Sequence, residues 1–258
     1  MKNAYKLQTC MTSDVGRIRE KNEDNFIFHG IYNEKVEKHM EYIEKICLTE
    51  PMLYGIFDGM GGEAYGEVAS RLMAMICQKY QLHSGHLSKD ACALCQIGNE
   101  FVTREEELRG LSMGSTASML IFHEKAFACN VGDSPIFLYR DGVLRKIYEE
   151  QTEKKIYEQM QFIGILNKKK KYRLLQHIGM QGEGVRISPY IEEIEIQDQD
   201  IFLICSDGLT DMVSEATIER VLSVFDEDSA EKLVNLALEN GGYDNVTVIL
   251  IKVAGYNL

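Results

Sequence analysis

Four short acidic segments of this chain share one arrangement, in which carboxylates stand at the end of an apolar, strand-like run. Their acidic residues are Glu23 with Asp24, Asp58, Asp207 and Asp244. Carboxylates at strand ends can converge at one rim of a sheet, and hard divalent cations need clustered oxygen ligands. Without a cation such a cluster would be repulsive. The pattern therefore predicts a divalent-metal site, although each Asp-Gly pair taken alone is also a common turn.

Strands are expected to hold most of these carboxylates, because the segments beside them are rich in Ile, Val, Phe and Tyr. The predicted strands span 25–32, 52–57, 115–122, 126–131, 136–139, 191–196, 201–205 and 246–253. Apolar residues at helical spacing predict helices over 64–80, 88–107, 214–224 and 228–240. Strands in runs, with helices clustered between them, indicate an α+β layered fold rather than a repeated βαβ unit.

The segment 34–47, EKVEKHMEYIEKIC, is interpreted as an amphipathic helix inserted between the first two predicted strands. Val36, Met40, Ile43 and Cys47 recur at spacings of three and four residues, which would place them on one helical face. We expect this helix to pack against the body of the domain. A surface helix without a function is the alternative.

Length, composition and charge restrict the classes of protein to which the chain can belong. With 258 residues, three prolines and no low-complexity linker, it is expected to form a single domain over 1–258. The net charge of −12 argues against a general nucleic-acid binder. No apolar run approaches the length of about eighteen residues that indicates a membrane-spanning helix. An odd number of cysteines and a polar N-terminal segment favour a reducing, cytoplasmic setting.

Six stretches of the chain resemble the metal-dependent Ser/Thr protein phosphatases of the type 2C class, in their bacterial single-domain form. The six occur in the order of the family and run from residue 13 to residue 251. They are SDVGRIREKNEDN (13–25), GIFDGMGGEAYGEVAS (55–70), GSTASMLIF (114–122), NVGDSPIFLYRDGVL (130–144), FLICSDGLTDMV (202–213) and GGYDNVTVILI (241–251). One such stretch would be weak evidence, whereas six in order at suitable spacing make the resemblance specific.

The resemblance implies a four-layer α-β-β-α sandwich, with two antiparallel sheets flanked by helices, and a site for two Mn²⁺ or Mg²⁺ ions. By motif position, Asp58 would bridge the two ions, and the carbonyl oxygen of Gly59 would be a further ligand. Asp207 and Asp244 would complete the shell of one ion. The acidic pair at 23–24 would lie on the other side, binding directly or through water.

Two further positions gain expected roles from the resemblance. Arg19 resembles the phosphate-clamping arginine of the family, and its planar guanidinium group suits two phosphate oxygens at once. Asp133, in the GDS stretch, matches a position that can bind a third, weaker cation in bacterial relatives. A structural role for Asp133 in a turn is the alternative.

The implied activity is hydrolysis of phosphoserine and phosphothreonine in proteins, in opposition to a bacterial Ser/Thr kinase, by a monomer. Two cations lower the pKa of a shared water, and the resulting hydroxide attacks phosphorus directly. The sequence agrees, since it has no cysteine in a phosphate-binding C-x5-R loop. A pseudophosphatase that binds phosphoproteins is a second hypothesis, disfavoured because the expected ligands are retained. A phosphatase that serves an anti-sigma antagonist is a third, disfavoured because no sensor domain is expected here.

Three features depart from the family pattern. Met60 occupies the position where many eukaryotic members have a histidine proposed as the general acid, and bacterial members commonly carry Met there. Since Met cannot donate a proton, the leaving group would need a metal-bound water or the surroundings of the substrate. Pro135 replaces the arginine that usually follows GDS. The variable flap region over 148–176 contains four lysines, 168–171, which could attract acidic or phosphorylated surfaces or form a solvated basic loop.

A histidine and cysteine cluster offers a competing metal site. His83, His86, Cys92 and Cys95 have the spacing H-x2-H-x5-C-x2-C. The central gap is shorter than in zinc fingers, and cysteines three residues apart on a helix also serve as core residues. Zinc binding is therefore the less favoured interpretation of this segment.

Overall fold

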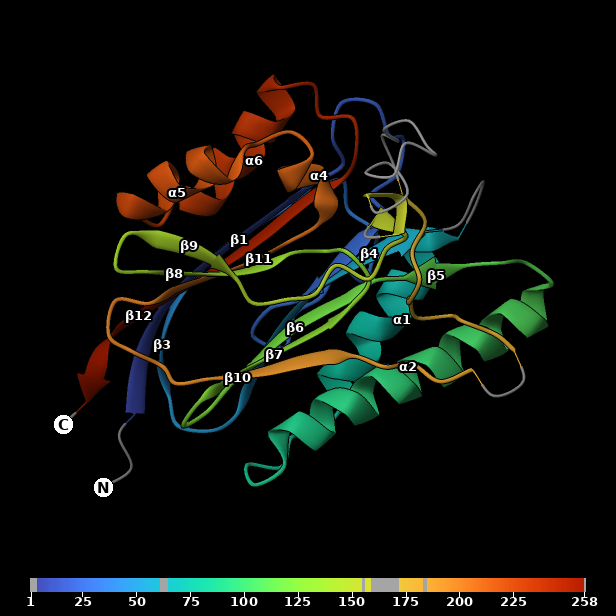
Figure 1. The fold of residues 1–258 in the computed structure, drawn as a ribbon, viewed down its shortest axis with the longest axis horizontal. Helices are drawn as coiled ribbons and strands as arrows, with labels where there is room; N and C mark the ends of the chain where they lie inside the picture. The colour runs from blue at the N-terminus through green and yellow to red at the C-terminus, as the bar shows by residue number, and fades with distance from the viewer. Residues whose placement is uncertain (1–3, 61–64, 155, 159–171, 183–184, 258) are drawn as a thin grey trace.

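Two antiparallel sheets stack face to face in the computed structural model, which describes residues 4–60, 65–154, 156–158, 172–182 and 185–257 (Figure 1). The first sheet has the strand order β3-β1-β12-β11-β8-β9. The second has the order β10-β7-β6-β4-β2, and β5 also pairs with β4. Every strand pairing in both sheets is antiparallel.

The strands of the two sheets have the following bounds. Those of the first sheet are β1 (Ala4–Asp14), β3 (His39–Leu48), β8 (Ile136–Arg140), β9 (Val143–Lys146), β11 (Ile201–Cys205) and β12 (Val246–Asn257). Those of the second sheet are β2 (Asp24–Ile27), β4 (Met52–Met60), β5 (Gly114–Ser115), β6 (Ala117–Phe122), β7 (Ala126–Val131) and β10 (Tyr190–Ile194).

The central strands are apolar along their whole length because both of their faces are buried. In β11, Phe202 and Ile204 pack between the sheets, while Leu203 and Cys205 face the helices on the outside. Successive side chains of a strand point to opposite faces, so a continuous apolar run fits a sheet that is covered on both sides.

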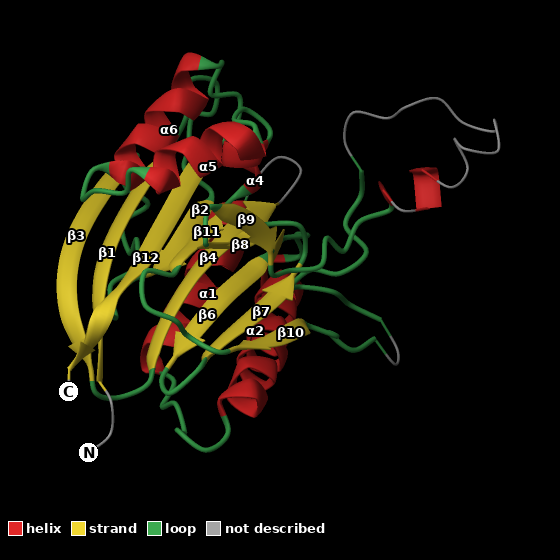
Figure 2. Cartoon of the chain, turned by 60° about the vertical axis from the view of Figure 1, so that its left-hand side comes forward, coloured by secondary structure: helices red, strands yellow, loops and turns green. Residues whose placement is uncertain are grey.

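Helices cover the outer face of each sheet (Figure 2). Helices α1 (Gly66–Lys79) and α2 (Leu87–Arg109) pack on the second sheet. Helices α4 (Asp207–Thr210), α5 (Glu215–Ser223) and α6 (Ser229–Glu239) pack on the first. Three layers of core therefore separate four layers of structure, which confirms the expected α+β sandwich of two antiparallel sheets. None of the helices in the described ranges is long and apolar enough to cross a membrane.

The helix predicted over 34–47 is wrong, because residues 39–48 form the edge strand β3. This strand pairs with the whole of β1 from Tyr5 to Asp14. Met40, Tyr42 and Ile46 pack against the core between the sheets, at the period of two that a strand requires. The residues chosen for the helical face separate, since Cys47 is exposed and Ile43 is 44% exposed.

Other strand boundaries differ from the expectation where the chain turns. The strand predicted over 25–32 ends at Ile27, because His29 and Gly30 both have positive φ and reverse the chain. Strand β4 continues past Asp58 to Met60. Strands β1 and β9 and the short helix α4 had no counterpart among the predicted elements.

Candidate functional site

Asp24 and Asp58 are direct cross-strand partners on β2 and β4, so their side chains share one face of the second sheet. Asp24 is buried, and its Oδ2 accepts a hydrogen bond of 2.7 Å from the Thr247 hydroxyl. The other oxygen, Oδ1, is buried and has no hydrogen-bond partner among the described residues. Two carboxylates placed opposite one another repel, and an unpaired buried oxygen adds to that cost.

Three further aspartates act electrostatically on this pair. Burial raises the pKa of Asp24 to about 7, and the negative charges of Asp207 and Asp244 add to the effect. Burial also raises the pKa of Asp58, together with the charges of Asp24, Asp207, Asp133 and Asp244. The five aspartates of this acidic cluster come from five separate segments of the chain. Crowded carboxyl groups with raised pKa values ionise only at a cost in free energy. A hard divalent cation removes that cost, because it binds carboxylate oxygens and balances their negative charge.

The chemistry of the cluster, rather than the geometry of its side chains, fits such a cation. Within the described ranges, no three Asp, Glu, His or Cys side chains converge closely enough to define a metal site by geometry alone. The carboxylates instead have other partners, of which the Arg19–Asp244 ion pair is one. The fit rests on the unpartnered oxygen of Asp24 and on the mutual repulsion of the cluster.

Glu23 adds a sixth carboxylate at the edge of the cluster. Its side chain is half-buried, and burial followed by the charge of Glu67 raises its pKa. Its backbone carbonyl accepts hydrogen bonds from the Gly59 amide at 3.1 Å and the Ser70 hydroxyl at 2.6 Å. These bonds join the segment before β2 to both β4 and α1.

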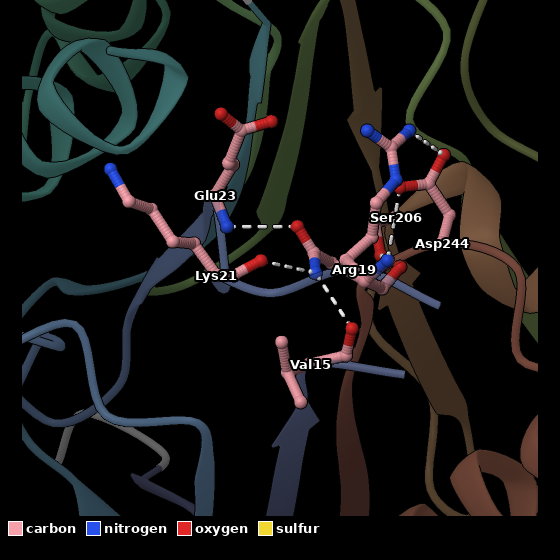
Figure 3. A network of polar contacts seen from close by, with 7 residues as sticks. Val15, Arg19, Lys21, Glu23, Ser206 and Asp244 are labelled. Carbon is pink, nitrogen blue, oxygen red and sulfur yellow. Dashed lines mark hydrogen bonds and ion pairs between the residues drawn. The ribbon is translucent and has the colours of Figure 1, made fainter. Parts of the chain in front are cut away.

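Asn245 ties the segment that carries Arg19 and Glu23 to the segment that carries Asp244. Its Oδ1 accepts from the Glu23 amide at 2.8 Å, and its Nδ2 donates to the carbonyls of Val15 and Lys21 at 2.9 Å each. Figure 3 labels three of these partners, Val15, Lys21 and Glu23, and draws the hydrogen bonds as dashed lines. The sequence placed Asn245 beside Asp244 but gave no indication that it orders two segments more than 200 residues apart.

Arg19 and Asp244 form an ion pair at the surface of the site. The guanidinium Nη2 lies 2.9 Å from Asp244 Oδ2, and the arginine side chain is 45% exposed (Figure 3). Although burial opposes it, the hydrogen bond and charge of Asp244 raise the pKa of Arg19. Arg19 is thus held over the acidic cluster by one of the residues expected to bind metal.

Each glycine that follows an acidic residue of the site permits a close approach of backbone. A Cβ on Gly59 would lie 2.3 Å from the Gly66 carbonyl oxygen and 2.5 Å from that of Glu23. A Cβ on Gly208 would lie 2.0 Å from the carbonyl oxygen of Asn245. Contacts under about 3 Å are incompatible with a side chain, so the Asp-Gly pairs do more here than form turns. Gly59 lets α1 approach β4, which holds Asp58, and Gly208 lets α4 approach the segment of Asp244 and Asn245 just before β12.

A buried hydroxyl pair supports Asp58 from the neighbouring strand segment. The Asp58 amide donates to Thr116 Oγ1 at 3.0 Å, and that oxygen lies 2.7 Å from the Ser134 hydroxyl. Both hydroxyl residues are buried. Ser134 follows Asp133, so this contact also fixes the loop of the possible third metal ligand. Neither Thr116 nor Ser134 was predicted from the sequence to belong to the site.

Two other sequence predictions fall outside this cluster. The histidines and cysteines weighed as a zinc site do not converge: His83 lies 3.1 Å from Asp90, and Cys95 Sγ lies 3.7 Å from Cys129 Sγ. The lysines at 168–171 lie outside the described residues.

Comparisons with known proteins agree on one family. A family model described as protein phosphatase 2C matches residues 11–159. The serine/threonine protein phosphatase PstP of Mycobacterium tuberculosis is 30% identical over 259 residues, which cover 97% of this chain and 46% of that protein. This chain therefore spans about half the length of that relative. The serine/threonine phosphatase stp of Listeria innocua is 28% identical over 256 residues, which cover 93% of each chain.

Solved structures of PstP are similar over nearly the whole chain. The crystal structure of the Mycobacterium tuberculosis enzyme has a TM-score of 0.77 at 27% identity and covers 97% of this chain and 100% of its own. The catalytic domain of PstP in complex with two manganese ions has a TM-score of 0.76 at 28% identity, with the same coverage.

Proposed function

We propose that this chain, which belongs to the protein phosphatase 2C family, is a metal-dependent protein serine/threonine phosphatase. The observation that carries the proposal is the cross-strand pair Asp24 and Asp58, with its raised pKa values and unpartnered buried oxygen. The pair implies a cation, and PstP, a relative with the same fold, has been solved with two manganese ions.

Two Mn²⁺ or Mg²⁺ ions are the proposed cofactors. Asp58 would bridge them, with the Gly59 carbonyl as a further ligand, and Asp207 and Asp244 would complete one shell. Glu23 and Asp24 would serve the other, and Asp133 is the candidate ligand for a third ion. When bound, a pair of such ions acidifies water and stabilises the oxygens of an in-line phosphoryl displacement.

Arg19 would bind the phosphoryl group of the substrate. Its Nη2 lies 2.9 Å from Asp244 Oδ2 in the structure, so this carboxylate and a phosphate oxygen would compete for that nitrogen. A cation that engages the Asp244 carboxylate would weaken this ion pair and release Arg19. Metal binding would thereby prepare the phosphate-binding residue, while Asn245 keeps the backbone of both segments in place.

Phosphorylated proteins are the proposed substrates, as the names of the relatives imply for those proteins. We extend this to the substrates of a bacterial Ser/Thr kinase, acted on by a monomer in the cytoplasm. A pseudophosphatase on the same fold is the alternative, and the intact acidic cluster argues against it, because a decayed site is expected to lose ligands.

Hydrolysis of a phosphothreonine peptide, with and without Mn²⁺ and a chelator, tests the proposal. We expect turnover only with metal, and a loss of at least about a hundredfold in kcat for Asp58→Asn. Asp198→Asn is the matched control, since Asp198 is outside the acidic cluster and bonded to Gln199. Metal-independent turnover, or full activity of Asp58→Asn, would contradict the mechanism. Bound metal without turnover of any phosphopeptide would favour the pseudophosphatase.

A further inference from the structure

His177 lies beside the strand pair that carries Asp58, although it comes from a distant part of the chain. The next residue, Ile178, forms a two-way backbone bridge with Ser115, with hydrogen bonds of 2.8 and 3.0 Å. Ile178 is fully buried against the helices of the second sheet. Because successive side chains in an extended segment point to opposite faces, His177 faces away from that core.

The imidazole ring and the side chain of Met60 both lie beside Gly114. Asp58 and Met60 are two residues apart on β4, so their side chains share one face of the sheet. Gly114 is the cross-strand partner of Met60. A Cβ on Gly114 would lie 2.8 Å from His177 Cδ2 and 3.3 Å from Met60 Cγ. The missing side chain of Gly114 therefore leaves the space in which the ring of His177 approaches Met60.

The ring has unused hydrogen-bonding capacity. Its Nδ1 is buried and has no hydrogen-bond partner in the part of the chain that the structure describes. The ring also lines a pocket of about 500 Å³, together with residues of the end of α2 and of the segment after Ile178. Glu106 lies at this pocket, where its carboxylate accepts from the Met113 amide and the Gln181 side chain. Burial lowers the pKa of the His177 ring, and the charge of Glu106 opposes that shift, so the protonated ring gives up its proton more readily than a free imidazolium.

The proposed reaction needs a proton donor for the oxygen that leaves phosphorus. When the bond between phosphorus and the seryl or threonyl oxygen breaks, that oxygen leaves as a strongly basic alkoxide unless it is protonated. Met60 has no proton to give. His39, at the end of β1 and β3 in the other sheet, lies 2.9 Å from Asp14 and is held there.

We propose that His177 donates this proton, an inference that rests on the proposed phosphatase activity. The attacking water forms the new bond to phosphorus, the bond to the seryl or threonyl oxygen breaks, and the imidazolium proton moves to that oxygen. The neutral ring then takes up the proton that the water released, by exchange through solvent. The pocket beside the ring receives the polypeptide of the leaving serine or threonine.

The leaving group itself provides the test. p-Nitrophenolate is a weak base that departs without a proton, whereas a threonine alkoxide does not. His177→Gln is therefore expected to lower kcat for a phosphothreonine peptide by about a hundredfold and kcat for p-nitrophenyl phosphate by less than about threefold. Imidazole added to His177→Ala should restore part of the peptide activity. His123→Gln, on the hairpin between β6 and β7, is the matched control and should leave both rates unchanged.

Each other outcome contradicts a specific step. An equal fall in kcat for both substrates would mean that His177 only maintains the structure of the site. An unchanged kcat for both would show that His177 takes no part in the reaction. Turnover of p-nitrophenyl phosphate by the same preparation shows that the variant is folded and binds metal. Wild-type protein that hydrolyses neither ester would instead contradict the proposed function, and with it this role.

Discussion

Asp58→Asn should make the metal-free protein more stable while removing its response to metal. The substitution takes away one of two carboxylates that face each other across β2 and β4. Direct cross-strand partners have Cβ atoms about 5 Å apart, and two unit charges at that separation repel by about 3 kcal/mol at an effective dielectric constant near 20. No hydrogen bond to the carboxylate of Asp58 is seen among the described residues, so the amide loses little.

The sign of the pH dependence follows from the raised pKa values. A carboxyl group whose pKa is higher in the folded than in the unfolded chain holds its proton more tightly when folded. In the metal-free protein, Asp24 and Asp58 therefore contribute most to stability at acid pH. The protein loses this contribution as pH rises from about 4, the unfolded value, through about 7, the value for Asp24. The gain from Asp58→Asn should accordingly be largest near pH 8.5 and small at pH 4.

Thermal unfolding in the presence of a chelator measures the effect. A gain of about 3 kcal/mol corresponds to a rise in Tm of about 6–12 °C for a chain of this size. Adding Mn²⁺ should raise the Tm of the wild type well above that of Asp58→Asn, since ligand binding stabilises only the protein that can bind it. Asp198→Asn should change neither value. If Asp58→Asn were no more stable than the wild type at pH 8.5 without metal, the repulsion inferred for the acidic cluster would be wrong.

Three further substitutions test the parts that position the site. Gly208→Ala should lower the free energy of unfolding in urea by more than about 2 kcal/mol, because its Cβ would lie 2.0 Å from a backbone oxygen. Gly85→Ala is the control: its Cβ would meet nothing within 4 Å, and it should lower the free energy of unfolding by less than about 1 kcal/mol. Asn245→Ala removes three hydrogen bonds and should cost about 2–4 kcal/mol, with faster hydrogen exchange at the Glu23 amide. Arg19→Ala should change stability by less than about 1 kcal/mol but raise the KM for a phosphopeptide at least about tenfold. An unchanged KM would exclude Arg19 from phosphate binding.

Most central strands could be predicted from the sequence because their apolar runs reflect burial on both faces, as in β6 and β11. The edge strand β3 could not be predicted in this way. Its residues Met40 and Ile43 suit a helical period as well as a strand, and only pairing with β1 along ten residues decides between them. Backbone hydrogen bonds to a strand some 35 residues away outweigh local periodicity, because they satisfy the donors and acceptors of the whole segment.

The carboxylates themselves were evident in the sequence, since Asp58, Asp207 and Asp244 each stand beside a strand-like run at positions that match one family. Their chemistry follows from residue type alone: oxygen donors and negative charge predict a divalent cation. Their interaction cannot be read from residue type, because it depends on the sheet register that buries Asp24 opposite Asp58. Burial is the main cause of both raised pKa values, and the charges of the neighbouring aspartates add to it.

Contacts between segments far apart in the sequence set the positions of the remaining side chains of the site. Asn245 gains its role from carbonyls at residues 15 and 21, and His177 gains its place beside Met60 from a bridge to Ser115 and the missing side chain of Gly114. No spacing along the chain encodes such neighbours, because tertiary packing alone sets which backbones approach one another. The sequence by itself predicted which residues would bind cations and phosphate. The tertiary structure determined how their charges interact, and which histidine stands where Met60 cannot supply a proton.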